Sequence, residues 1–123
     1  WIAYNSDESG SFEVYLESFP THGGKRQISL AGGSGPRWRA DGKELFYHSL
    51  DGKLMAVSVA GSAAALTTGT PTPLFAFRPA GVIAVPSYAV TRDGQRFLLS
   101  AIVETYPRAP LSVVQNWTAA IGR

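Results

Sequence analysis

The sequence contains no cysteine among its 123 residues and only two histidines. Without cysteine, a disulfide framework, a thiolate nucleophile and a cysteine-ligated metal are all excluded. A metal site on histidine is not expected either, because neither His22 nor His48 has a partner at the spacing of metal ligands. We therefore predict no resident metal and no cofactor.

Charged residues are also scarce. They make up 16% of the chain, the formal net charge is +2, and the lysines and arginines are scattered without a basic run. Such a balance does not imply a nucleic-acid partner. Long hydrophobic runs are missing as well: the longest nearly apolar stretches, such as residues 97–103, are far shorter than the ~20 residues that span a bilayer. No membrane insertion by this segment is predicted, and the first residues do not resemble a signal peptide.

Helical periodicity is absent nearly everywhere, and 13 glycines and 8 prolines indicate frequent turns. A period of two is common instead, which is typical of strands. In FEVYLES, Phe12, Val14 and Leu16 are expected on one buried face of a strand. Three further apolar runs with the same character are KLMAVSV (53–59), RFLLSAIV (96–103) and LSVVQNW (111–117). The sequence therefore predicts an all-β fold.

Asp-Gly occurs three times between such runs, at Asp41-Gly42, Asp51-Gly52 and Asp93-Gly94. This pair suits a two-residue hairpin turn, because glycine readily adopts a positive φ and aspartate tolerates it. The first two pairs would then join three strands of one antiparallel meander, at 35–40, 43–48 and 53–59.

The meander belongs to a repeated unit. DGKELFY (41–47) matches DGQRFLL (93–99) at a spacing of 52, and WIAY (1–4) matches ELFY (44–47) at a spacing of 43. YNSDESGSFEVYL (4–16) parallels YHSLDGKLMAV (47–57) with a turn longer by two residues, and KRQISL (25–30) corresponds to TPLFAF (72–77). Four short antiparallel strands recurring every 40 to 50 residues describe the blade of a β-propeller.

This alignment predicts three blades. They cover residues 1–30, which lack an innermost strand, 35–77, which are complete, and 86–117, which lack an outermost strand. Known propellers close with roughly four or more blades. We therefore expect a C-terminal part of a longer propeller, or a set of blades that closes with other chains. Open sheet edges would favour association with neighbouring blades or with itself.

The residues that carry the repeat resemble a known family. Pro36, Trp38, Asp41-Gly42-Lys43 and Leu45-Phe46-Tyr47 are similar to the TolB-like propeller repeat, a relative of the WD-repeat propellers. ESGSFEVYLESFP, GGKRQISL and PLSVVQNWTAAI resemble the C-terminal propeller blades of some bacterial serine/threonine kinases. The resemblance implies a bacterial protein, either cytoplasmic or extracytoplasmic, and a TolB-like propeller fold.

Few residues suggest chemistry. NSDESG (5–10) begins like a calcium loop, but Leu16 stands where a bidentate glutamate is required, so a solvated polar turn is favoured. Trp38 lies between Arg37 and Arg39 in the one compact basic–aromatic cluster, and we expect its ring in the core between blades. Arg37 or Arg39, on an innermost strand, could meet an anionic ligand. Tyr88, together with Tyr106, is a candidate for an aromatic binding surface.

No convergent catalytic set is visible, so the chain itself is predicted not to be an enzyme. The favoured function is a non-catalytic module that binds a protein or peptide, serving as the sensor or scaffold part of a larger kinase-like protein. The alternatives are a propeller that binds a small molecule or glycan, and the accessory propeller of a hydrolase or peptidase. Because one fold hosts many functions, the fold does not decide among them.

Overall fold

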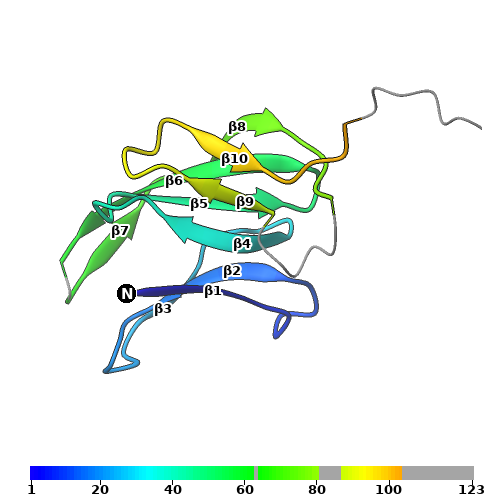
Figure 1. Ribbon diagram of the computed structural model, residues 1–123. Coiled ribbons are helices and arrows are strands. Elements are labelled where there is room, and N and C mark those ends of the chain that lie inside the picture. The colour runs from blue at the N-terminus through cyan, green and yellow to red at the C-terminus, as the bar shows by residue number, and fades with distance from the viewer. Residues whose placement is uncertain (63, 81–86, 104–123) are drawn as a thin grey trace, which may run out of the picture.

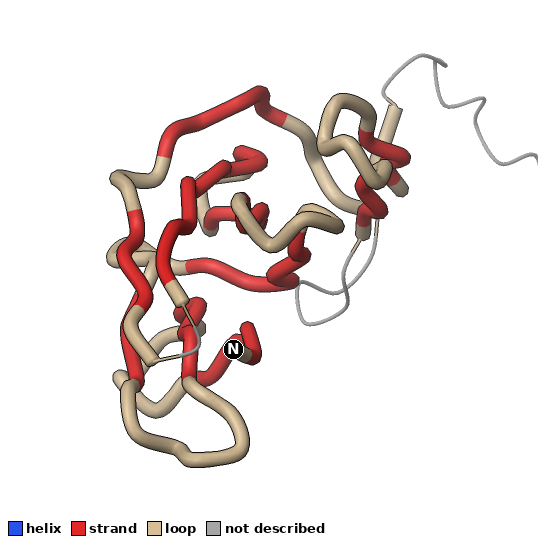
Figure 2. Tube along the Cα trace, turned by 90° about the vertical axis from the view of Figure 1, so that its left-hand side faces the viewer, coloured by secondary structure: helices blue, strands red, loops and turns tan. Residues whose placement is uncertain are grey.

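The computed structural model describes residues 1–62, 64–80 and 87–103. These residues form strands and loops, and no helix occurs among them, as Figures 1 and 2 show. The all-β prediction is therefore confirmed, and the described residues contain no helix that could span a membrane. The ten strands in these described ranges are β1 (Ile2–Ser6), β2 (Glu13–Glu17), β3 (Lys25–Gln27), β4 (Gly33–Trp38), β5 (Glu44–Ser49), β6 (Lys53–Gly61), β7 (Leu66–Thr68), β8 (Thr72–Ala76), β9 (Tyr88–Val90) and β10 (Phe97–Leu99).

The strands form three antiparallel sheets (Figure 1). The first sheet has the order β1-β2-β3, and the third pairs β9 with β10. In the middle sheet β4, β5 and β6 are neighbours, and the second edge of β6 is shared by β8 along residues 53–56 and by β7 along residues 59–61. The strands predicted between residues 35 and 77 thus lie in one sheet. The segment that separates the third and fourth of them adds the short strand β7.

The Asp-Gly pairs do lie at turns, but the turns differ from the predicted two-residue type. The N–H of Gly42 donates to the carbonyl of Arg39 at 2.9 Å, which makes Ala40 and Asp41 the central residues of the turn. A type I′ turn needs a positive φ at both central residues. Here Gly42 itself has φ +71° and Asp41 is not in the positive-φ region. The glycine therefore follows the turn, where the left-handed conformation returns the chain to the next strand.

The same small network recurs at all three turns. The side chain of the first turn residue donates to the aspartate two positions later: Arg39 to Asp41 at 2.8 Å, Ser49 to Asp51 at 2.5 Å, and Thr91 to Asp93 at 2.5 Å. Each glycine then has a positive φ, +71°, +85° and +72° in chain order. The carboxylates of Asp41 and Asp93 also accept from the backbone N–H two residues on, each at 3.0 Å. The repeat seen in the sequence is thus also a repeat of hydrogen bonds.

Strand register follows the same spacing. Leu45 lies opposite Trp38 in the middle sheet, and Phe97, 52 residues after Leu45, lies opposite Val90, 52 residues after Trp38.

The strand register of the first sheet corrects the sequence alignment. Tyr4 pairs with Tyr15, eleven positions on, whereas the equivalent Tyr47 pairs with Met55, eight positions on. The first turn is therefore longer by three residues, not two.

The middle sheet has two apolar faces, and both are covered. Its A face carries Leu45, Tyr47, Val57 and Val59, which form one core with Val14 and Leu16 of the first sheet. Its B face carries Phe46, Leu54 and Ala56, which form a second core with Tyr88, Phe97 and Leu99 of the third sheet. Alternate side chains of a strand point to opposite faces, so β5 and β6 contribute to both cores.

Equivalent faces of the three sheets point the same way. Phe97 is the equivalent of Leu45 and packs toward the middle sheet, just as Leu45 packs toward the first sheet. Ala3 is the equivalent of Phe46, and each packs toward the next sheet along the chain. The A face of each sheet therefore meets the B face of the sheet before it, which is a head-to-tail arrangement. In a two-layer sandwich, by contrast, the A face of one sheet would pack against the A face of the other.

The predicted buried face of β2 is confirmed at Val14 and Leu16, which are fully buried, and is wrong at Phe12. Phe12 lies outside β2 and is 47% exposed. Glu13 and Tyr15 alternate with the predicted buried residues and therefore point to the opposite face, yet both are only 4% exposed. Glu13 is buried because its carboxylate accepts from the Ser29 hydroxyl and from the Gly32 N–H. The strand expected over residues 96–103 covers only Phe97–Leu99, and the expected strand at 111–117 lies outside the described residues.

Candidate functional site

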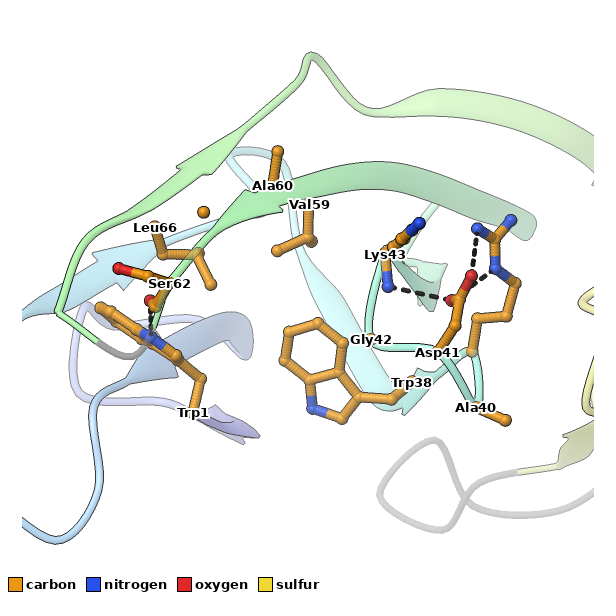
Figure 3. Close-up of a pocket in the computed structure, with 12 residues that line it drawn as sticks. Trp1, Trp38, Ala40, Asp41, Gly42, Lys43, Val59, Ala60, Ser62 and Leu66 are labelled. Atoms are coloured by element: carbon orange, nitrogen blue, oxygen red, sulfur yellow. Dashed lines mark hydrogen bonds and ion pairs between the residues drawn. The ribbon is translucent and has the colours of Figure 1, made fainter.

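A groove of about 650 Å³ lies at one end of the middle sheet (Figure 3). Its walls come from segments far apart in the chain: Trp1, the end of β4 with the turn after it, the end of β6, and the start of β7. Figure 3 shows the indoles of Trp1 and Trp38 on two sides of the hollow, with Val59 and Leu66 beside them.

Each indole is anchored on one side and available on the other. Trp38 packs against the core between the first and middle sheets, as its position in the sequence suggested, and its remaining surface lines the groove. The indole N–H of Trp1 donates to the Ser62 carbonyl at 3.3 Å. Both rings are half-buried. Fixed aromatic faces of this kind offer large apolar contact area at a small entropic cost.

Of the two cationic side chains that line the groove, Arg39 is paired with carboxylates and Lys43 is not. The guanidinium of Arg39 donates to both carboxylate oxygens of Asp41 at 2.8 Å and to Glu44 at 3.0 Å. These bonds from Arg39, together with the smaller contribution of the bond from the Lys43 N–H, lower the pKa of Asp41 to about 2. Arg39 is thus neutralised locally. The exposed Lys43 ammonium balances the second of these two carboxylates in the overall charge, but it makes no ion pair within the described chain and so stays accessible to a ligand.

The residues predicted to face a ligand are separated by the structure. Arg39 lies on the groove but is held by its two carboxylate partners. Arg37 is exposed on β4 and does not line the groove. Tyr88 is 5% exposed, and its hydroxyl donates to the Gly35 carbonyl at 2.7 Å. Burial raises the pKa of Tyr88, so this phenol stays neutral and joins β9 to β4 instead of presenting an aromatic surface. Tyr106 lies outside the described residues.

The two histidines lie in different surroundings. His22 is exposed and bonds Glu17 at 3.0 Å, while His48 is 8% exposed on β5 with its Nε2 atom unpartnered within the described chain. Burial lowers the pKa of His48, and its ring lies 4.8 Å from that of Phe77, at a second cleft of about 540 Å³. No group of three metal-ligating side chains occurs within the described ranges.

The polar segment at residues 5–10 comprises the end of β1 at Asn5 and Ser6 and a surface turn over residues 7–10. Asp7 and Glu8 are exposed, Glu8 is paired with Lys25, and Gly10 closes the turn through a 2.8 Å bond to the Asp7 carbonyl. Among the residues that the structure describes, the buried carboxylate is that of Glu13, which no pattern in the sequence singled out. Its position between apolar residues of a strand was the available signal, because an acidic residue flanked by core positions is buried only when hydrogen-bonded.

Comparison with known proteins gives no relative: no family model, curated protein or solved structure matches this chain. Its function must therefore be inferred from the arrangement of its own residues.

Proposed function

We propose that this chain is a non-catalytic interaction module of propeller-type blades that binds an extended peptide in the groove between Trp1 and Trp38. The proposal rests on the groove itself, where two half-buried indoles flank a hollow of about 650 Å³ beside Lys43. An extended peptide would place apolar side chains against the indoles and an acidic group near the ammonium. Aromatic-lined grooves favour proline-rich segments in particular, because these are already extended in solution and lose little conformational entropy on binding.

The proposed propeller architecture is supported by two features. Equivalent turns carry equivalent hydrogen bonds 52 residues apart, at Asp41 and Asp93. The three sheets also stack head to tail, the arrangement that successive propeller blades share. The resemblance of the repeat to TolB-like and kinase-linked blades leads us to propose that the module is the sensor or scaffold part of a larger bacterial protein. A kinase signature elsewhere in the reading frame would support this, and a nucleophile elbow would favour the hydrolase alternative.

Trp38→Ala is expected to weaken peptide binding tenfold or more, which corresponds to about 1.4 kcal/mol. The measurement is fluorescence anisotropy of labelled, proline-rich synthetic peptides with and without acidic residues. Phe19→Ala is the matched control, since Phe19 is a 65% exposed aromatic residue outside the groove. Equal affinity of the two variants, or no binding of any peptide to the unaltered protein, would contradict the proposal.

Trp38 also contributes to the core, so a surface variant keeps this test independent of folding. Lys43→Glu should weaken the acidic peptides several-fold and leave the neutral ones unchanged, whereas Arg92→Glu, on the equivalent turn of the third sheet, should change neither. The second candidate ligand is a neutral glycan, which the two indoles also favour. Binding of a neutral oligosaccharide, with no binding of any peptide, would support it. A glycan would respond to Trp38→Ala and not to Lys43→Glu.

A further inference from the structure

The outer face of the third sheet carries an apolar residue that its equivalents in the other sheets bury. Leu98 is 78% exposed. Its equivalent in the middle sheet, Phe46, is 1% exposed, and its equivalent in the first sheet, Ala3, packs into the core beneath the middle sheet. The B faces of the first and middle sheets are therefore covered, whereas the B face of the third sheet is open within the described residues.

The structure also shows what covers that face. Phe46 is covered by Phe97, the A-face residue of the following sheet, with ring centroids 5.1 Å apart and an interplanar angle of 82°. In the middle sheet the position equivalent to Phe97 is Leu45, which is fully buried against the first sheet. Each B-face position is thus covered by the A face of the next sheet.

The first sheet leaves part of the complementary surface open: Glu13 and Tyr15 on its A face are buried, but the end of this face at Ile2 is not. Its position equivalent to Leu45 and Phe97 is Ile2, which is 42% exposed. Tyr4, the equivalent of Tyr47, lies on the same face, where its ring stacks on Tyr15 with centroids 5.8 Å apart and its hydroxyl donates to Glu17. An apolar centre with a polar rim is the usual composition of an interface between proteins.

We propose that a second copy of this chain docks its first sheet on the third sheet, with Ile2 of one copy over Leu98 of the other. The contact would repeat the Phe97-over-Phe46 packing found inside the chain. Such an interface is heterologous, because each copy contributes a different surface, and it builds a ring if the rotation closes and a filament if it does not. The peptide groove is not needed for it.

Sedimentation velocity of the full chain over a range of concentrations tests the proposal. We expect species larger than the 13.1 kDa monomer to increase with concentration, and both Leu98→Asp and Ile2→Asp to be monomeric. An equimolar mixture of the two variants should form a one-to-one dimer and nothing larger, because only one intact Ile2 surface then meets one intact Leu98 surface. Leu30→Asp is the control, since Leu30 is 87% exposed and lies on neither face.

Three results would overturn the proposal. The first is an unaltered chain that sediments as a monomer up to ~1 mM, because association would then be weaker than a Kd of about 1 mM. The second is self-association of Ile2→Asp, which would indicate a symmetric contact through Leu98. The third is a mixture of the two variants that remains monomeric, in which case association does not depend on the pairing of these two surfaces.

Discussion

Phe46→Ala is expected to destabilise the fold by about 3–5 kcal/mol, the usual cost of removing a buried phenylalanine ring. Phe46 is 1% exposed, and its ring touches Phe97 edge to face between the middle and third sheets. Removing it would leave a cavity between the two sheets, lined by Leu54, Ala56 and Tyr88. Urea unfolding followed by tryptophan fluorescence gives the change in the free energy of unfolding.

The control for this substitution is its equivalent in the repeat. Leu98→Ala, measured in dilute protein, should change stability by no more than about 0.5 kcal/mol, since Leu98 is 78% exposed. The two substitutions differ in whether a following sheet covers the site. Similar losses for both would mean that the third sheet does not cover Phe46.

Gly94→Ala is expected to cost about 2–4 kcal/mol, more than the same change at Gly42. Both glycines have a positive φ, +72° and +71°, so alanine adds about 1 kcal/mol of backbone strain at either site. A Cβ at Gly42 would meet nothing within 4 Å, whereas at Gly94 it would lie 2.7 Å from Arg39 Cδ and 3.3 Å from Phe46 Cζ. Overpacking of this kind adds about 1–3 kcal/mol.

The difference in stability between the two glycine variants tests whether the turn of the third sheet packs against the middle sheet. Arg39 cannot swing away freely, because Asp41 and Glu44 hold its guanidinium. Thermal unfolding monitored by circular dichroism should therefore give a lower midpoint for Gly94→Ala than for Gly42→Ala. Equal midpoints would show that the turn at Gly94 does not rest on the middle sheet.

Local features of this fold could be predicted from the sequence because short-range patterns determine them. Period-two alternation located most of the strands, though not the short β7, and each Asp-Gly pair marked a turn. At Asp41 and Asp93 the carboxylate accepts a hydrogen bond from the backbone N–H two residues on. The turn type was wrong, because the first turn residue also bonds the aspartate, as Ser49 does with Asp51. This hydrogen bond favours a turn in which glycine is the fourth residue and not one of the two central residues.

The candidate site could not be predicted, because its walls meet only in three dimensions. Trp1 and Leu66 are far apart in the chain and line the same groove. Arg39 was a reasonable ligand candidate by sequence, yet Glu44 and Asp41 neutralise it across the turn. The burial of Tyr88 likewise depends on its contact with Gly35, 53 residues earlier. Pairings at such distances carry no signal in one sequence.

The head-to-tail stacking of equivalent faces is the central claim, and nuclear Overhauser contacts test it most directly. We expect cross-peaks from the Phe46 ring to Phe97 on one face of the middle sheet. From the other face we expect cross-peaks between the methyl groups of Leu45 or Val57 and those of Val14 or Leu16. Contacts from Leu45 or Val57 to Phe97, or from Phe46 to Val14, would place the outer sheets on the wrong faces and contradict this stacking.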